Sequence, residues 1–178
     1  IYTYSSTGAN FIWDGAGTDT IDASSAAEKV TIYLEPGYWG FGGDTKADTI
    51  TSKGQITVNF GTSIENLRGS DFDDILFGNS LDNEISGGAG NDILYGGDGN
   101  DKFESGMYWS IGDDIFYGGK GNDGYFFNAK ASFAPYNKDQ TNTAPARTHT
   151  HSIETFRTTH QASATNASTR SRNKSQRY

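Results

Sequence analysis

Acidic residues at regular spacing are the feature of this sequence that could do chemistry. An Asp or Asn recurs through the middle of the chain at intervals of nine residues, with one interval of thirteen. Carboxylate oxygens held at fixed spacing can ligate a hard cation, or a pair of them can cleave a glycosidic bond. The residues are Asp74, Asn83, Asp92, Asp101, Asp114 and Asp123.

These residues occupy the sixth position of a nine-residue repeat that fills residues 69–127. From Gly69 the repeat reads GSDFDDILF, GNSLDNEIS, GGAGNDILY and GGDGNDKFE, then SGMYWSIGDDIFY with four extra residues, then GGKGNDGYF. Glycines at positions 1, 2 and 4 allow a tight turn that aims backbone carbonyls inward. Positions 7–9 predict a short strand whose central residue enters the core. The eighth position is apolar in every repeat: Leu76, Ile85, Leu94, Phe103, Phe116 and Tyr125.

Two such repeats predict one coil of eighteen residues, so alternate turns stack on the same edge. One edge then carries Asp74, Asp92 and Asp114, and the other carries Asn83, Asp101 and Asp123, if the four extra residues near Tyr108 and Trp109 loop out. Carboxylates stacked at roughly 5 Å repel one another strongly unless a cation lies between them. An all-oxygen donor set with many carbonyls suits Ca²⁺ better than Mg²⁺, and the repeats contain no His or Cys for Zn²⁺ or copper.

Two alternative interpretations explain fewer features of the repeat. A flexible Gly/Asp linker needs neither a strict period nor an apolar residue at every eighth position. An enzyme with a carboxylate pair could be drawn from the many Asp residues, but their even spacing already has a structural explanation. We therefore expect no catalytic site in this chain.

Charge and composition divide the chain into three regions. Residues 69–127 hold 12 of the 22 acidic residues and 2 of the 14 Lys and Arg residues. Such a block repels itself without cations and argues against a nucleic-acid partner. Residues 1–68 read as a β-rich segment, with strands expected at 11–13, 30–34 and 55–60. Residues 128–178, rich in Thr, Ser, Asn and Arg, predict a basic, mostly disordered tail.

Further motifs connect the chain to a known family. The nonapeptide resembles the RTX calcium-binding repeat. Three segments before it resemble the region that precedes the roll in serralysin-type metalloproteases (the peptidase M10 C-terminal domain). They are Ile12–Asp22 (IWDGAGTDTID), Leu34–Gly37 (LEPG) and Phe60–Asn66 (FGTSIEN). The resemblance implies an all-β fold in which residues 69–127 form a parallel β-roll that binds several Ca²⁺ ions.

The resemblance also implies which residues hold the ions. In that family the first four positions of each turn supply carbonyls, and the sixth-position Asp bridges neighbouring ions. Carried onto this chain, the ligands are Gly87, Gly88, Ala89, Gly90 and Asp92; Gly96, Gly97, Asp98, Gly99 and Asp101; Gly118, Gly119, Gly121 and Asp123; and Asp74 and Asp114. The family's W-D-x-x-G-x-D turn adds Asp14, Gly17 and Asp19, although an ordinary Asx turn would use the same residue types.

The expected function is that of a noncatalytic module of a secreted, extracellular serralysin-like metallopeptidase. The zinc-binding H-E-x-x-H helix of the family is absent, and the three His residues, His149, His151 and His160, are expected to be scattered in the tail. The resemblance implies the type I secretion machinery as a partner, although neither end of the chain carries an export signal, which suggests a fragment. We expect a monomer without membrane insertion. An RTX module of another secreted enzyme or an adhesin is the alternative.

Overall fold

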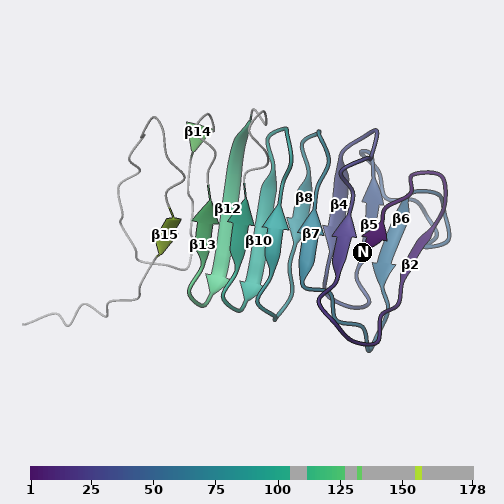
Figure 1. Cartoon of the computed structure of the whole chain (residues 1–178). Coiled ribbons are helices and arrows are strands. Elements are labelled where there is room, and N and C mark those ends of the chain that lie inside the picture. The colour runs from purple at the N-terminus through teal and green to yellow at the C-terminus, as the bar shows by residue number, and fades with distance from the viewer. Residues whose placement is uncertain (105–111, 127–131, 134–154, 158–178) are drawn as a thin grey trace, which may run out of the picture.

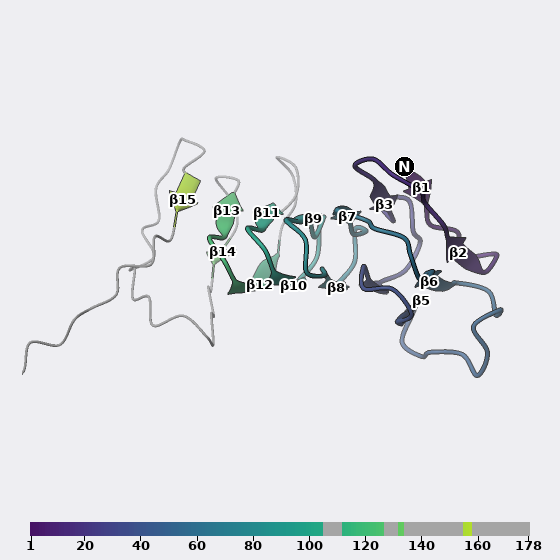
Figure 2. The same cartoon turned by 90° about the horizontal axis from the view of Figure 1, so that it is seen from below.

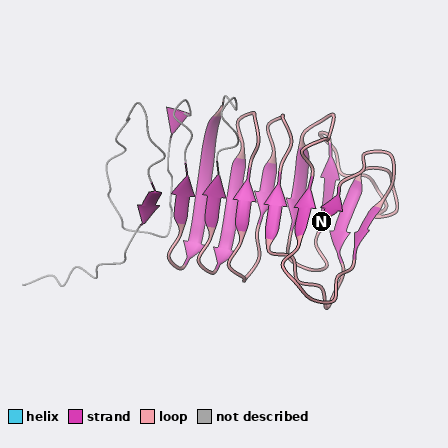
Figure 3. Cartoon of the chain, in the orientation of Figure 1, coloured by secondary structure: helices cyan, strands magenta, loops and turns pink. Residues whose placement is uncertain are grey.

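The computed structural model describes residues 1–104, 112–126, 132–133 and 155–157, and every regular element in this part of the chain is a strand (Figure 1, Figure 3). The short Gly-bounded apolar segments of the sequence account for this, because a segment of three or four residues cannot sustain a helix. The all-β expectation is confirmed.

The strands form two sheets that face each other, as the view along the strands shows (Figure 2). The first sheet contains, in spatial order, β1 (Tyr2–Thr3), β3 (Thr20–Asp22), β7 (Asn66–Arg68), β9 (Glu84–Ser86), β11 (Lys102–Glu104), β13 (Gly124–Phe126) and β15 (Thr155–Arg157). The second sheet contains β14 (Ser132–Phe133), β12 (Asp113–Lys120), β10 (Ile93–Asp98), β8 (Ile75–Phe77), β4 (Val30–Tyr33), β5 (Trp39–Gly42), β6 (Gln55–Val58) and β2 (Asn10–Ile12).

Successive repeats alternate between the two sheets, so that two nonapeptides complete one coil of a parallel β-roll. In the second sheet Leu76 of β8 lies beside Leu94 of β10, eighteen residues later. The next neighbour of Leu94 is Phe116 of β12, twenty-two residues later. The four extra residues therefore change the length of one coil and leave the strand register intact, as the repeat pattern predicts.

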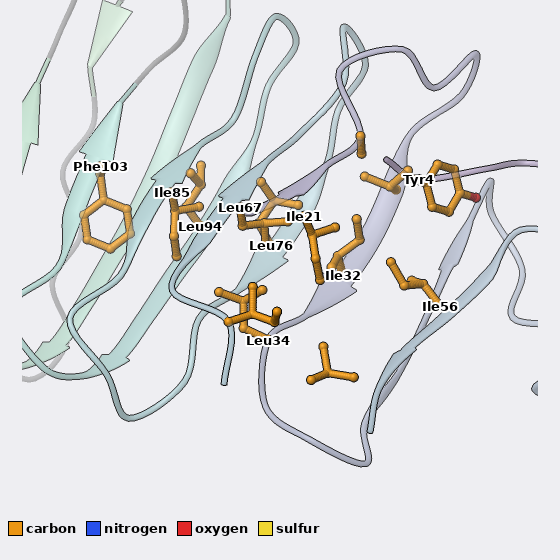
Figure 4. Close-up of a cluster of buried hydrophobic side chains, with 14 of the residues drawn as sticks. Tyr4, Ile21, Ile32, Leu34, Ile56, Leu67, Leu76, Ile85, Leu94 and Phe103 are labelled. Carbon is orange, nitrogen blue, oxygen red and sulfur yellow. The ribbon is translucent and has the colours of Figure 1, made fainter. Parts of the chain in front are cut away.

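The core is one continuous cluster of apolar side chains between the two sheets (Figure 4). Its centre is built from the eighth positions, and five of the six are at most 1% exposed. The sixth, Tyr125, is 8% exposed. Since the side chains of one strand alternate in direction, the flanking seventh and ninth positions point outward. The predicted core positions of the repeats are confirmed.

The outer face of the second sheet carries a row of stacked aromatic rings. Tyr33, Phe77, Tyr95 and Tyr117 lie in register on β4, β8, β10 and β12, and all four are partly buried. Their ring centroids are 4.4, 4.6 and 4.6 Å apart, with interplanar angles of 8° or less. These contacts tie successive coils together through apolar surface and need no metal ion.

The N-terminal end of the roll is wider than the repeats. β5 and β6 enter the second sheet beside β4, and the β4–β5 and β5–β6 pairs are antiparallel (Figure 2). The expected strands at 11–13, 30–34 and 55–60 correspond to β2, β4 and β6. β4 occupies the place of a preceding coil for β8, because Ile32 pairs with Leu76. The repeats thus continue from an N-terminal platform, residues 1–68, which includes β4, β5 and β6.

Two short strands from the region after the repeats pair with the last coil. β14 lies parallel to β12, and β15 lies antiparallel to β13. The rest of residues 128–178 lies outside the described residues, and so does the expectation of disorder made for it. Within the described residues, no helix is long and apolar enough to cross a membrane.

Candidate metal centres

The sixth-position residues lie in two stacked rows along the edges of the roll. We call them the Asp92 edge (Asp74, Asp92, Asp114) and the Asp101 edge (Asn83, Asp101, Asp123). All six are at most 4% exposed. A buried carboxylate is costly unless hydrogen bonds or a cation compensate for its lost hydration. Each buried carboxylate oxygen in these rows therefore needs a hydrogen-bond donor or a cation.

One oxygen of each later carboxylate has a backbone partner in the preceding coil. Asp92 Oδ1 accepts a hydrogen bond from Asp74 N at 2.8 Å, and Asp114 Oδ1 accepts one from Asp92 N at 3.0 Å. On the other edge, Asp101 Oδ1 accepts from Asn83 N at 2.9 Å, and Asp123 Oδ1 accepts from Asp101 N at 3.1 Å. The structure thus brings together the rows that the repeat period predicted.

The second oxygen of two carboxylates is left without a hydrogen-bond donor. Asp92 Oδ2 and Asp101 Oδ2 are the two buried side-chain polar atoms that lack a hydrogen-bond partner in the described part of the chain. Buried polar atoms in folded proteins are nearly always paired, so such an atom points to a ligand that is not a protein group. For a carboxylate oxygen, a cation is such a ligand.

The glycine turns place the Gly118 carbonyl near Asp101 Oδ2. The glycines at positions 2 and 4 have φ between +92° and +132°, a region that L-residues with side chains avoid. A Cβ atom on Gly96 would meet both Asp101 Oδ2 and the Gly118 carbonyl. The six glycines are Gly88, Gly90, Gly97, Gly99, Gly119 and Gly121.

The buried carboxylates resist ionisation in the absence of a cation. Burial, with the charges of Asp114 and Asp74 adding to it, raises the pKa of Asp92 to about 8. Burial likewise raises the pKa of Asp101 to about 7 and that of Asp114 to about 6. A bound cation would oppose both causes, since it replaces hydration and neutralises the repulsion. The donor set is entirely oxygen, which fits Ca²⁺.

Two residues of the first coil differ from the later ones. The Asp74 carboxylate accepts hydrogen bonds from Val30 N, Ser70 N and Ser70 Oγ, so both of its oxygens have protein partners. Asn83 Oδ1 accepts from Asn79 N at 2.8 Å. Both oxygens of Asp74 thus have protein donors, whereas Asp92 Oδ2 and Asp101 Oδ2 have none among the described residues.

Asp98, the third position of its turn, is expected to contribute its backbone carbonyl. Its carboxylate forms an exposed salt bridge with Lys120 at 2.9 Å, so its side chain faces away from the turn. Only its backbone carbonyl can take the role that the resemblance implies. Ala89 lies at the equivalent position of the preceding turn, and its N–H donates to the Ser70 carbonyl.

A separate acidic group lies at the start of the chain. The carboxyls of Asp14 and Asp19 share a hydrogen bond, which raises the pKa of Asp19. Burial acts to raise the pKa of Asp14, but hydrogen bonds, first from Asp19 and then from Gly15 N–H, outweigh it and lower that pKa. Gly17 closes the turn with φ of +133°. The structure therefore brings the three predicted residues of this turn together.

Glu65 joins this group although the sequence did not single it out. Its Oε2 accepts a hydrogen bond from Asp19 N at 2.9 Å. The two residues are 46 positions apart, and they meet because Thr20 of β3 pairs with Asn66 of β7. The FGTSIEN segment, which was noted as a resemblance, was the one available signal.

The described residues offer only oxygen ligands to these centres. The chain has no Cys, and its three His residues lie outside the described residues. Within the described ranges no three His, Asp or Glu side chains, Asp14, Asp19 and Glu65 included, lie close enough together to hold a metal ion on their own. A cation on either edge of the roll would thus depend on one or two carboxylates and on backbone carbonyls.

Comparison with known proteins agrees with this geometry. The chain matches the RTX calcium-binding nonapeptide repeat in four copies, at residues 4–26, 61–80, 68–103 and 110–126. The first copy includes the Asp14–Asp19 turn, and the others follow the edges of the roll. No curated protein matches the chain. The chain therefore contains RTX calcium-binding repeats, a noncatalytic class of repeat.

Proposed function

We propose that this chain is a calcium-folded, noncatalytic module of a secreted serralysin-like zinc metallopeptidase. Calcium binding follows from the class of the repeats. The proposal adds where the ions bind, what they do for the fold and which kind of protein carries the module. It depends above all on one observation, the buried and unpaired oxygens of Asp92 and Asp101.

The ligands proposed for the roll are the carboxylates and carbonyls of the glycine turns. Asp92 acts with Gly87, Gly88, Ala89 and Gly90. Asp101 acts with the equivalent carbonyls of 96–99, and Asp123 with those of Gly118, Gly119 and Gly121. Asp114 completes the Asp92 edge. Bound Ca²⁺ supplies positive charge between these oxygens and offsets the repulsion that burial magnifies.

A further ion is proposed at the turn of Asp14, Gly17 and Asp19. The two carboxyls lie close enough to share a hydrogen bond, and Glu65 adds a third negative charge nearby. A cation there would replace the shared proton. It would also link β3 to β7 near the start of the roll, through residues that are distant in the sequence.

The proposed role of calcium is to complete folding outside the cell. At low calcium concentration the twelve acidic residues of 69–127 repel one another and oppose the compact roll. Each ion that binds only the folded chain stabilises it by RT ln(1 + [Ca²⁺]/Kd). The module would therefore stay open for export through a type I machinery and fold in millimolar extracellular calcium.

Circular dichroism of the purified chain tests this proposal. Titration with Ca²⁺ should produce a cooperative gain of β signal, and a chelator should reverse it. Mg²⁺ at the same ionic strength is the matched control and should have little effect, because it keeps its waters and demands octahedral geometry. A spectrum that neither ion changes, in a chain that does not take up Ca²⁺, would refute the proposal.

The parent protein is proposed from the resemblance of residues 12–66 to the segment that precedes the serralysin roll. An RTX module of another secreted enzyme or of an adhesin would carry the same repeats. The coding sequence on both sides of this segment separates the two. An upstream H-E-x-x-H motif supports the peptidase, whereas a different catalytic domain or a long repeat array supports the alternative.

A further inference from the structure

We propose that the first coil of the roll is closed by its own side chains, so that the calcium sites begin one coil later, at Asp92 and Asp101. This inference rests on the proposed function, since it assigns the sites of the same ions. In the first coil, hydrogen bonds from Ser70 and Asn79 take the place of calcium, and Asp74 is not a calcium ligand.

Each gap between two stacked turns is marked by the position-1 glycine of the earlier turn. A Cβ atom on Gly96 would meet Asp101 Oδ2 and the Gly118 carbonyl, so these oxygens face each other between turn 96–101 and turn 118–123. We call this the second gap of the Asp101 edge. In the first gap of the Asp92 edge, a Cβ atom on Gly69 would meet Asp74 Oδ2 and the Gly87 carbonyl. The two gaps are therefore geometrically equivalent.

The oxygens in equivalent gaps differ in their partners. Asp101 Oδ2, in the second gap of the Asp101 edge, is buried with no hydrogen-bond donor among the described residues, and so is Asp92 Oδ2, at the same position of turn 87–92. In the first gap of the Asp92 edge, Asp74 Oδ2 accepts from Ser70 N at 2.5 Å and from Ser70 Oγ at 3.0 Å. The Ser70 hydroxyl thus supplies to Asp74 what a cation would supply to Asp92.

Two asparagine side chains close the first gap of the Asp101 edge. Asn83 Oδ1 accepts from Asn79 N at 2.8 Å, and Asn83 Nδ2 donates to Asn79 Oδ1 and to the Glu65 carbonyl at 3.1 Å. Asn79 Nδ2 donates to the Ile64 carbonyl at 2.9 Å. These amides carry no charge, so the gap holds no repulsion for a cation to relieve.

The backbone of the first coil also lacks the glycines of the later turns. Positions 2 and 4 hold Ser70 and Phe72 on one edge, and Asn79 and Leu81 on the other. The corresponding residues of turns 87–92, 96–101 and 118–123 are glycines with left-handed φ. The first coil therefore has Cβ atoms at the four positions where those turns have none.

The first coil is instead attached to the N-terminal platform by hydrogen bonds. Asp74 Oδ1 accepts from Val30 N at 2.7 Å, which joins the coil to β4. Asn79 and Asn83 donate to carbonyls at Ile64 and Glu65, just before β7. The first coil can therefore form on the platform before calcium is present and can serve as the template for the calcium-dependent coils.

Counting bound ions in isosteric variants of the whole chain tests the assignment. Isothermal titration calorimetry should show one ion fewer per chain in Asp92→Asn, and one fewer in Asp101→Asn, than in the unmodified chain. Asp74→Asn should bind the unmodified number. Loss of an ion in Asp74→Asn would overturn the proposal, as would an unmodified count in a folded Asp92→Asn chain.

A gain of a site provides a second, independent test. The double variant S70G/F72G gives the first turn the glycine pattern of turn 96–101 and removes the hydroxyl that occupies Asp74. It should bind one additional Ca²⁺ ion. The matched control is Phe72→Gly alone, which keeps the Ser70 hydrogen bonds and should bind the unmodified number. A folded double variant with no additional ion would refute the substitution of calcium by Ser70.

The same measurements separate this inference from the proposed function. If the unmodified chain takes up no calcium, the proposed function fails. If it takes up calcium and Asp74→Asn loses an ion, the proposed function stands and the inference alone fails. Far-UV circular dichroism in calcium shows whether each variant is folded before its ions are counted.

Discussion

Asp92 accepts a hydrogen bond from the backbone N–H of Asp74 through Oδ1 at 2.8 Å, while its Oδ2 is buried without a donor in the described part of the chain. One oxygen of this carboxylate therefore links two coils, while the other is buried with no donor to stabilise its negative charge. The joining bond forms whether or not a cation is bound. The stability of the coil therefore depends on whether a proton or a cation neutralises Oδ2.

The stability of the chelated chain should fall as the pH rises. Burial raises the pKa of Asp92 to about 8, of Asp101 to about 7 and of Asp114 to about 6. An unfolded Asp has a pKa of about 3.9, so the folded state favours the protonated form. This contribution is complete below about pH 4 and is lost as the pH rises through the folded values. Thermal melts in chelator at pH 5, 6.5 and 8 should show a decreasing Tm.

Calcium should reverse this trend, because it binds the ionised carboxylates. The rise in Tm on adding calcium should therefore grow from pH 5 to pH 8. A Tm in chelator that increases over this range would contradict the role given to the buried carboxylates.

Gly97→Ala should destabilise the roll even in calcium. Gly97 has φ of +113°, and a Cβ atom there would meet the Asn79 carbonyl of the preceding coil. We expect a loss of about 1–3 kcal/mol, the usual cost of holding a residue with a side chain in such a conformation. Chemical denaturation in saturating calcium measures it.

Gly8→Ala is the control for this variant. A Cβ atom on Gly8 would meet only Ser5 Oγ, at 3.9 Å. The change in unfolding free energy should stay within about 0.5 kcal/mol. Equal effects of the two substitutions would show that the left-handed turn is not what the Gly97 variant disrupts.

Tyr95→Ala should weaken the roll both in calcium and in chelator at pH 5, where protonation of the buried carboxylates favours the folded roll. The Tyr95 ring stacks on Phe77 and Tyr117 at 4.6 Å on either side. Each stacked pair is worth about 1 kcal/mol, so the variant should lose about 2 kcal/mol in either condition. Tyr95→Phe keeps both stacks and should unfold like the unmodified chain in urea titrations. A loss confined to the calcium-bound state would argue against a metal-independent aromatic row.

Asp19→Asn should remove the ion proposed near the N-terminus and leave the ions of the roll in place. Asp19 shares a hydrogen bond with Asp14, and its backbone N–H donates to Glu65. Calorimetry should count one ion fewer per chain, while the calcium-induced gain of β signal persists. Asp48→Asn, which changes an exposed carboxylate, is the control. An unchanged ion count in Asp19→Asn would leave the turn as an ordinary Asx turn.

The repeat period was enough to predict the architecture of the roll. Position 8 of each repeat had to be apolar because it enters the core, and position 6 had to be polar because it closes a turn. These local requirements recur every nine residues, so the period alone predicted that Asp92 would stack on Asp74 and under Asp114. The hydrogen bonds between coils confirm this order across the four extra residues.

The partners of each carboxylate were decided only in the tertiary structure. Asp74 and Asp92 occupy the same position of the repeat, yet Ser70 and Val30 satisfy Asp74, while Asp92 Oδ2 has no protein donor in the described residues. Likewise, Glu65 reaches Asp19 across 46 residues through the pairing of β3 with β7. A local period specifies which residues point inward. The energy of a buried charge depends on every group near it in space, and only the folded chain brings those groups together.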